Sequence, residues 1–506
     1  MTTVTTLHEL MAVGEDDAKA IEASGASPLT YKGFRALVSR TIATLNELGI
    51  GRNDRVAIVL PNGPAKATSF VAIASGATAA PLNPAYRTDE FDFYMTDINA
   101  KALVVEAGST SPAIDAAKKR GIRILTLQSD AANGAGAFTL TGASDGSRPA
   151  ASGPAEAADV ALILHTSGTT SRPKIVPLSH QNVAASAVNV ANSVGLTNSD
   201  RALNIMPLFH IHGLIAGVLA PLSKGGAIFC TPGFNALKFF AAMDESAPTW
   251  YTAVPTMHQA IVGRAHTNRA IIARHKLRFI RSSSSSLPPQ VITELEAAFG
   301  APVVEAYGMT EAAHQMASNP IGGTRKPGTV GQAAGPEVGI MDSDGNILNT
   351  GETGEIVIRG PNVTAGYENN AKANGEAYTN GWFRTGDQGM IDADGYITIT
   401  GRLKEIINRG GEKVSPREVD EILMDHPAVL QALTFAMPHD KLGEEVACAI
   451  VLREGLTATE RELRDFAGER LANYKVPRKI IMLDEIPKGA TGKLQRIGLA
   501  QKLGLA

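Results

Sequence analysis

The segment DVALILHTSGTTSRPK, residues 159–174, joins an apolar strand to a loop of small hydroxyl residues and decides the fold class. Its first part, Asp159–Leu164, has the continuous apolar character of a strand buried in a parallel sheet. The loop that follows contains Gly168, Arg172 and Lys174, so its N–H groups, hydroxyls and charges can surround an anion. Taken alone, the loop fits an ordinary surface turn equally well, and it does not match the P-loop pattern G-x-x-x-x-G-K-[ST].

Strand and helix signals alternate on both sides of this segment. Apolar residues recur at helical spacing over residues 31–48, short strands are expected at Val56–Leu60 and Ala102–Glu106, and Phe70–Ala80 reads as a helix of small residues. This alternation predicts an α/β fold with mostly parallel sheets. Residues 130–158 are rich in Ala, Gly and Ser, show no pattern, and are expected to form a surface excursion.

The character of the sequence changes after Gly328, where short β runs broken by Gly, Asp and Asn predict a β subdomain that extends to Thr400. Beyond Gly401 a charged segment opens a unit of roughly 100 residues, a common domain size. We therefore expect a large N-terminal domain, residues 1–401, built from two α/β subdomains and the β subdomain. A small α+β domain, residues 402–506, follows it.

Composition argues against several kinds of partner. With 506 residues, 44% hydrophobic and 19% charged, and a formal net charge of -3, the chain has no electrostatic reason to bind nucleic acid or an anionic membrane. It has neither a run of about 18 apolar residues nor a basic-then-apolar signal pattern. Its two cysteines, Cys230 and Cys448, cannot form a disulfide framework. We expect a cytoplasmic protein, either a monomer or a homodimer.

Five ordered motifs make the chain similar to the adenylate-forming superfamily, which includes acyl-CoA synthetases, peptide-synthetase adenylation domains and beetle luciferases. The motifs are TSGTTSRPK (166–174), YGMTE (307–311), GWFRTGD (381–387), GRLKE (401–405) and KGATGK (488–493). They span most of the chain in the family's order. The resemblance implies a ligase that uses ATP and Mg²⁺ to activate a carboxylate as an acyl-adenylate and then transfers the acyl group to coenzyme A. It also implies that the small C-terminal domain is mobile between the two steps.

The resemblance further implies which residues bind the nucleotide. Contacts with the ATP phosphates fall on Thr166, Ser167, Gly168, Thr169, Thr170 and Lys174. The adenine lies against Tyr307, with Glu305, Ala306 and Gly308 beside it. Thr310 meets the α-phosphate, Glu311 holds Mg²⁺, and Asp387 and Arg402 contact the ribose. A carboxylate suits a hard cation that bridges phosphate oxygens, and an acceptor-only carboxylate suits ribose hydroxyls. Without the motifs, Glu311 would read as an acid at a helix start, and the ribose pair as surface turn residues.

Two loop residues depart from the family's commonest pattern, because Ser171 and Ile175 stand where glycine is usual. A β-branched side chain disfavours positive φ, so Ile175 predicts an extended exit from the loop. We expect this residue to be tolerated, with some drag on loop closure as the effect to test.

The C-terminal residues carry the remaining implied roles. Lys493 matches the family's catalytic lysine, which bridges the attacking carboxylate and the phosphate, and Lys404 matches the hinge position. Contacts with coenzyme A are implied for Arg409, Gly410, Gly411 and Lys413. On their own, these cations would read as ordinary solvated side chains on turns.

The segments expected to surround the carboxylic acid substrate are polar. The segments FHIHG (209–213), the serine run 282–286 and TEAAH (310–314) place histidines and hydroxyls where a long chain or aryl ring would need apolar lining. A small dicarboxylic acid suits such lining, because imidazole N–H groups and a hydroxyl can hold the second carboxylate.

These segments, together with SRPK (171–174) and WYTAVPT (250–256), resemble the oxalate–CoA ligases of plants and fungi. The resemblance implies His212, Ser284 and His314 as oxalate-binding residues and His210 as a catalytic gate. Three alternatives stay open: another short polar or medium-chain acid as substrate, adenylation that loads a carrier protein, and non-catalytic nucleotide binding.

Overall fold

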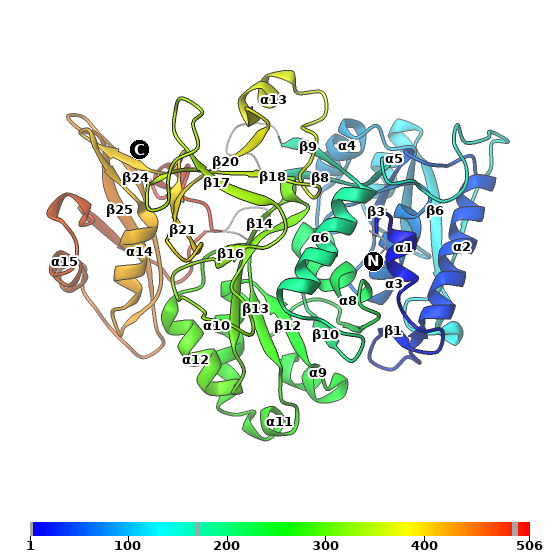
Figure 1. Ribbon diagram of the computed structural model, residues 1–506, viewed down its shortest axis with the longest axis horizontal. Helices are drawn as coiled ribbons and strands as arrows, with labels where there is room; N and C mark the ends of the chain where they lie inside the picture. The colour runs from blue at the N-terminus through cyan, green and yellow to red at the C-terminus, as the bar shows by residue number, and fades with distance from the viewer. Residues whose placement is uncertain (1–3, 167–172, 488–493) are drawn as a thin grey trace. The chain divides into compact units, whose positions relative to one another are not determined.

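The computed structural model describes residues 4–166, 173–487 and 494–506 (Figure 1). Contacts among the described residues divide them into two compact units. The first comprises residues 4–166, 173–337 and 359–377, and the second comprises residues 338–358, 378–487 and 494–506. No helix in these described ranges is both long and apolar enough to cross a membrane.

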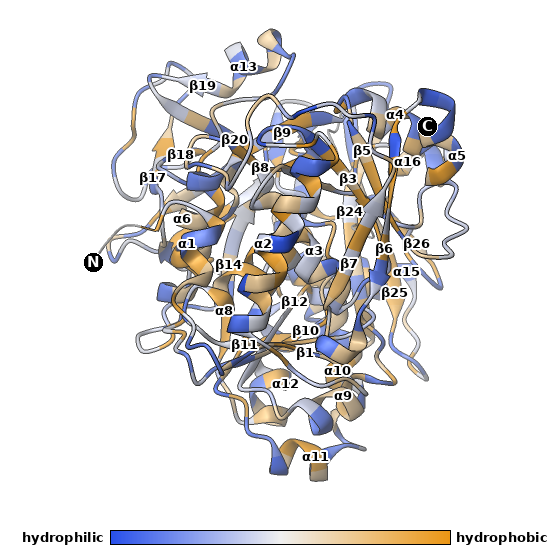
Figure 2. Cartoon of the chain, turned by 90° about the vertical axis from the view of Figure 1, so that its right-hand side faces the viewer, coloured by the Kyte–Doolittle hydropathy of each residue, from blue (hydrophilic) through white to orange (hydrophobic). Residues whose placement is uncertain are grey.

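The first unit contains a seven-stranded sheet in the order β7-β6-β5-β3-β4-β8-β9. Its strands are β3 (Arg55–Val59), β4 (Thr78–Pro81), β5 (Ala102–Glu106), β6 (Arg123–Ser129), β7 (Phe138–Gly142), β8 (Val160–Thr166) and β9 (Lys174–Ser179). Strands β6, β5, β3, β4 and β8 run parallel, and the two edge strands are antiparallel. Helices α4 (Thr88–Asp97) and α5 (Ala113–Arg120) bury apolar side chains against it. Figure 2 shows β3 and β5 in the apolar colour, while α2 (Tyr31–Glu47) carries both polar and apolar colours.

A nine-stranded sheet completes the first unit, in the order β16-β15-β14-β13-β12-β10-β11-β1-β2. Its strands are β1 (Lys19–Glu22), β2 (Leu29–Thr30), β10 (Arg201–Asn204), β11 (Ala227–Cys230), β12 (Trp250–Ala253), β13 (Phe279–Ser282), β14 (Val303–Met309), β15 (His314–Ser318) and β16 (Gln332–Ala333). The central strands β1, β11, β10, β12, β13 and β14 are parallel neighbours.

Helices cover both faces of this sheet (Figure 1). One face packs an apolar core against α9 (Phe239–Ser246), α10 (Pro255–Ala265), α11 (Arg269–Arg274) and α12 (Pro289–Phe299). The other face meets α6 (His180–Ser193), α7 (Ile211–Leu214), a π-helical turn (Ile215–Leu219) and α8 (Ala220–Leu222). The remaining helices of this unit are α1 (Leu7–Met11), α3 (Pro64–Ala74), α13 (Ala371–Ala377) and the short 3₁₀ turns Ala131–Asn133 and Thr310–Ala312.

The second unit contains two smaller sheets. The first is formed by β17 (Glu337–Met341), β18 (Gly354–Arg359), β19 (Tyr378–Thr379), β20 (Trp382–Ile391) and β21 (Ile397–Arg402). The second is formed by β22 (Ile407–Arg409), β23 (Glu412–Val414), β24 (Val429–His439), β25 (Gly443–Leu452) and β26 (Lys479–Met482). Helices α14 (Pro416–Met424), α15 (Glu460–Gly468) and α16 (Leu499–Lys502) and the 3₁₀ turn Asn473–Lys475 accompany the second sheet.

The predicted α/β class and mostly parallel sheets are confirmed, and β5 begins and ends where the sequence placed it. The helix predicted at Phe70–Ala80 is wrong in its second half. Helix α3 ends at Ala74 and β4 begins at Thr78, because Gly76 brings the turn against Ile42, where a Cβ would lie only 2.8 Å from a side-chain carbon.

Residues 130–158 also contain structure that the sequence did not reveal, since β7 pairs antiparallel with β6. The two contact units group residues 338–358 and 378–400 with the C-terminal residues, whereas the boundary predicted at Gly401 separates them. That boundary stays a prediction.

Candidate active site

The implied acyl and nucleotide residues of the first unit follow neighbouring parallel strands. His210 and His212 come after β10, Ser284 after β13, and Thr310 and Glu311 after β14. Carboxyl ends of parallel strands meet at one edge of a sheet, and this edge is where α/β folds place their ligands. The fold therefore brings residues more than 100 positions apart in the chain to one edge of the sheet.

Among the three side chains predicted to bind the acid, His212 contacts the other two. The Nδ1 atom of His212 lies 3.0 Å from the hydroxyl of Ser284. The imidazole rings of His212 and His314 stack with centroids 4.9 Å apart and planes inclined by 17°. The structure thus brings together the three residues that the sequence pattern singled out.

Residues with strained backbone conformations lie among the residues predicted to bind the acid. Ser284 has φ 76°, and Ala313 and His314 have φ 47° and φ 103°. Non-glycine residues rarely adopt positive φ, and such strain concentrates at functional sites. Two of the three predicted acid-binding residues are therefore held in conformations that cost free energy.

Further polar residues behind His212 were missed from the sequence. Thr252 on β12 and Arg281 on β13 are register partners, and both side chains are buried. The Thr252 hydroxyl lies 2.7 Å from Nε2 of His212, and an Arg281 Nη lies 3.4 Å from the same nitrogen. A sequence signal existed, because an arginine directly after the apolar pair Phe279-Ile280, in FIRS (279–282), is unusual in a strand.

The predicted gate residue His210 precedes α7 and lies beside Phe209, with ring centroids 4.6 Å apart. The ammonium group of Lys66 lies 5.1 Å from the centroid of the Phe209 ring. Lys66 is fully buried, donates to the carbonyl oxygens of Leu60 and Leu82, and has its pKa lowered to about 7 by burial. The buried Lys66 amine thus lies beside the segment that carries the predicted gate.

The predicted metal ligand Glu311 is only 6% exposed. Its Oε1 accepts a hydrogen bond of 2.8 Å from the hydroxyl of Tyr367. The ammonium group of Lys174, at the end of the phosphate loop, lies 4.0 Å from the centroid of the same tyrosine ring. Tyr367 was missed from the sequence, and it links the lysine of one motif with the acid of another.

A single carboxylate in this setting fits Mg²⁺. The described residues contain no group of three or more His, Cys, Asp or Glu side chains arranged to hold a metal. Mg²⁺ commonly binds through one or two carboxylates together with substrate phosphates and water. The role of Glu311 as the protein ligand of this ion stays a prediction.

The predicted adenine strand β14 is tightly packed. The Ser283 hydroxyl donates to the carbonyl oxygen of Ala306 over 2.9 Å, and the Leu287 N–H donates to Glu305 Oε1 over 3.2 Å. A Cβ at Gly308 would lie 1.8 Å from the carbonyl oxygen of His314. Only glycine allows this approach, which sets the path of β14 beside the acid-binding residues.

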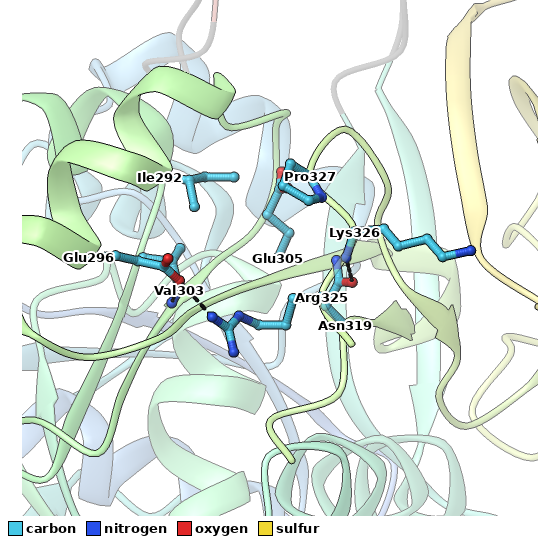
Figure 3. Close-up of a pocket in the computed structure, with 8 residues that line it drawn as sticks. All are labelled: Ile292, Glu296, Val303, Glu305, Asn319, Arg325, Lys326 and Pro327. Carbon is cyan, nitrogen blue, oxygen red and sulfur yellow. Dashed lines mark hydrogen bonds and ion pairs between the residues drawn. The ribbon is translucent and has the colours of Figure 1, made fainter. Parts of the chain in front are cut away.

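A hollow beside β14 carries charges of both signs (Figure 3). It is lined by Ile292, Glu296, Val303, Glu305, Asn319, Arg325, Lys326 and Pro327. Arg325 donates to Glu296 over 3.0 Å, and the Lys326 N–H donates to the Asn319 side chain over 3.2 Å. The first contact joins the segment after β15 to α12, and the second lies within that segment.

The phosphate loop itself lies largely outside the described residues, which include Thr166 and Lys174 but not Ser167, Gly168, Thr169 and Thr170. Thr166 and Lys174 are register partners at the ends of β8 and β9. Ile175 lies in β9 opposite His165, so the predicted extended exit is confirmed. Its effect on loop closure stays a prediction.

Within the second unit, the predicted ribose residues are a cross-strand pair. Asp387 on β20 is the register partner of Arg402 on β21, and Nε of Arg402 lies 2.9 Å from the carboxylate. The sequence alone suggested surface turns, but both residues lie in strands and Asp387 is buried.

The predicted coenzyme A residues surround a hairpin turn. Gly410 and Gly411, with φ 59° and φ 102°, form the two-residue turn between β22 and β23. Both positive angles are typical of a tight hairpin turn, which explains the glycines locally. Arg409 pairs with Glu445, and this carboxylate raises the arginine's pKa. Lys404 and Lys413 are exposed, whereas Lys493 lies outside the described residues.

Comparison with known proteins adds independent evidence. Residues 11–368 match the family described as AMP-binding enzyme, and residues 418–493 match the AMP-binding enzyme C-terminal domain. The chain is 44% identical to an oxalate–CoA ligase of Arabidopsis thaliana over 99% of this chain and 98% of the relative. It is 42% identical to an oxalate–CoA ligase of Saccharomyces cerevisiae, over 89% and 87%. The crystal structure of ATP-bound MatB from Rhodopseudomonas palustris is similar with a TM-score of 0.88, 29% identity and 98% coverage of each chain.

Proposed function

The chain belongs to the AMP-binding enzyme family of adenylate-forming ligases, and on this premise we propose that it joins oxalate to coenzyme A. The overall reaction converts oxalate, ATP and coenzyme A into oxalyl-CoA, AMP and diphosphate. The contact of His212 with Ser284, beside the stacked ring of His314, is the observation that carries the substrate assignment.

The polarity of this cluster favours a small diacid over the alternatives. Oxalate has no methylene groups, so it places its second carboxylate one bond away from the reacting one. Imidazole N–H groups and a serine hydroxyl can satisfy that carboxylate. A medium-chain acid would instead press methylenes against buried polar groups and leave them without partners, which costs free energy.

The first step forms the acyl-adenylate. An oxygen of one oxalate carboxylate bonds to the α-phosphorus of ATP, and the bond to the departing diphosphate breaks. When bound, Mg²⁺ neutralises phosphate charge, and Glu311 is the residue that would hold it. For the remaining contacts we propose the loop residues with Lys174 at the phosphates, Tyr307 at the adenine and Thr310 at the α-phosphate.

We propose that Lys493 supplies the positive charge that brings the carboxylate and the α-phosphate together, because mutual repulsion of two anions is the main barrier to this attack. Asp387 and Arg402 would hold the ribose, since the carboxylate accepts from hydroxyls and the arginine already orients it.

In the second step the thiol sulfur of coenzyme A bonds to the acyl carbon, the bond between that carbon and the AMP oxygen breaks, and the thiol proton passes to solvent. We propose that the segment Arg409–Lys413 contributes to this step and that residues 402–506 move between the two steps around Lys404. We also propose a cytoplasmic location, which suits the buried free thiols of Cys230 and Cys448.

A panel of acids tests the function. CoA-dependent AMP formation is measured with oxalate, malonate, acetate, glycolate, a medium-chain acid and a cinnamate. The proposal expects the highest kcat/KM for oxalate. A higher kcat/KM for any other acid in the panel would contradict the substrate assignment but not the proposed ligase reaction.

A further inference from the structure

Arg281 is a buried cation without a buried anion to match it. Its side chain is 0% exposed, and no carboxylate among the described residues pairs with it. Its acceptors in the described part of the chain are neutral: Gln315 Oε1 at 3.0 Å, Thr252 Oγ1 at 3.4 Å and Nε2 of His212 at 3.4 Å. No atom of that part accepts a hydrogen bond from its Nε. Burying a guanidinium in this way is costly unless a negative charge arrives nearby.

Successive side chains of β13 point to opposite faces of the sheet, and Arg281 lies on the face that carries the residues predicted to bind the acid. Ile280 packs into the apolar core formed with α9–α12, so Arg281 projects to the opposite face, toward His212. Because Arg281 is fully buried and Ser284 is partly exposed, His212 stands between the guanidinium and the open end of the site. An effect of the arginine on an acid at Ser284 would therefore pass through the histidine.

The hydrogen bonds around His212 indicate which of its ring nitrogens carries the proton. A guanidinium can only donate, and its Nη faces both the Thr252 hydroxyl and Nε2 of His212. If the Thr252 hydroxyl accepts from the guanidinium and donates onward, Nε2 of His212 accepts from it over 2.7 Å, and the imidazole proton then lies on Nδ1. Protonating both nitrogens would place a second cation about 3.4 Å from the first, and His314 stacks on the same ring.

We propose that Arg281 and Thr252 are positioning residues that hold His212 as a neutral Nδ1–H donor, so that donors point outward from the guanidinium to the acid's second carboxylate. The chain runs from Arg281 to Thr252, to His212 and to Ser284, whose hydroxyl proton remains free to be donated to the carboxylate. This role rests on the proposed function, since it assigns specificity to the same acid site. The pKa of Arg281, lowered by burial to about 9, leaves it charged at neutral pH.

The first test reads the imidazole directly. ¹⁵N spectra of histidine-labelled wild-type protein at pH 7.5, with His212 assigned by comparison with His212→Gln, should show a protonated Nδ1 and a bare Nε2. A protonated Nε2, or an imidazolium, would overturn the proposal. This measurement requires no acid substrate, so its result is independent of whether oxalate is the preferred acid.

The second test uses Arg281→Gln and Thr252→Val, each assayed with oxalate and acetate. We expect the KM for oxalate to rise on the order of 10- to 100-fold, with kcat and the acetate reaction changed much less, because the second carboxylate is held equally before and during reaction. Arg281→Lys should recover part of the oxalate affinity. Matched controls are Arg278→Gln, which removes an arginine paired with Asp200 just before β13, and Thr41→Val, which removes a buried hydroxyl on α2.

Equal losses with oxalate and acetate in both Arg281→Gln and Thr252→Val would show a merely structural role and overturn the proposal. If Arg281→Gln does not fold, the Thr252→Val kinetics and the ¹⁵N spectra still test the proposed positioning role. If the wild-type protein prefers another acid, the proposed substrate is wrong. The protonation of the His212 nitrogens would still show whether the proposed chain of hydrogen-bond donors exists.

Discussion

The hydroxyl of Tyr367 donates to Glu311 over 2.8 Å, while the ring of the same tyrosine lies 4.0 Å from the ammonium group of Lys174. One side chain thus orients the proposed metal ligand and supports a proposed phosphate ligand. A hydrogen bond to a charged group contributes roughly 1.5–3 kcal/mol, and a cation over an aromatic face adds about 0.5–2 kcal/mol.

Tyr367→Phe removes the hydrogen bond and keeps the ring. We expect kcat/KM for ATP to fall on the order of 10-fold and the Mg²⁺ concentration for half-maximal rate to rise, because Glu311 loses its orientation. Oxalate-dependent exchange of diphosphate into ATP, titrated with Mg²⁺, measures both. Tyr474→Phe is the control, since no hydrogen bond of its hydroxyl is found among the described residues. An unchanged Mg²⁺ requirement in Tyr367→Phe would remove the tyrosine from the metal site.

Lys493→Ala separates the two half-reactions. Loss of this cation should reduce adenylate formation from oxalate and ATP by 100-fold or more, on the order found when a charge-stabilising donor is removed. Thioester formation from preformed oxalyl-adenylate and coenzyme A should change little. Equal loss in both half-reactions would argue against the assigned role.

Gly308→Ala should disrupt the site through the backbone. The added Cβ would meet the His314 carbonyl oxygen at 1.8 Å, so β14 and β15 must separate and move Tyr307 and His314. We expect the thermal midpoint to drop and diphosphate exchange to be lost. Gly263→Ala on α10 is the matched control, because no atom lies within 4 Å of its Cβ, and it should stabilise by about 0.5–1 kcal/mol. Normal exchange by Gly308→Ala would contradict this packing.

The sequence predicted these elements unevenly, for physical reasons. Strand β5 has a continuous β-branched and apolar run between polar ends, and its bounds were predicted correctly. The segment Phe70–Ala80 consists of small residues without periodicity, so the end of α3 depends on the packing of Gly76 against Ile42. Strand β7 is a short alternating run, FTLTG, inside a stretch rich in Ala, Gly and Ser, and it was overlooked because its pairing with β6 is what defines it.

The residues of the candidate site were also predicted only in part. His212, Ser284 and His314 belong to motifs and were found from the sequence, whereas Tyr367, Thr252 and Arg281 were not. Each missed residue acts through a partner at least 29 positions away, so even where the local sequence is unusual, as at Arg281, it cannot show which residue the side chain contacts.

Acid should weaken the first unit through His180. Its Nδ1 accepts from the Leu7 N–H and its Nε2 lies 2.9 Å from the Ala74 carbonyl oxygen, and burial lowers its pKa to about 4. An unfolded histidine titrates near 6.5. Between these values the unfolded chain binds a proton that the folded chain does not, so stability falls as the pH drops below about 6.5.

From pH 7 to pH 5 this histidine should cost about 2 kcal/mol of unfolding free energy. The measurement is urea unfolding followed by Trp250 fluorescence in a Trp382→Phe background, with and without His180→Gln. The difference between the two proteins should shrink or reverse at pH 5. A difference that stays constant between the two pH values would assign the acid sensitivity to other groups.

The fate of one oxygen atom tests the central claim most directly. The enzyme is supplied with oxalate labelled with ¹⁸O in all four oxygens, together with ATP and coenzyme A, and the products are analysed by mass spectrometry. Attack by a carboxylate oxygen on the α-phosphorus predicts AMP with one ¹⁸O and diphosphate with none. Unlabelled AMP, or label in diphosphate or inorganic phosphate, would contradict activation of oxalate as an acyl-adenylate.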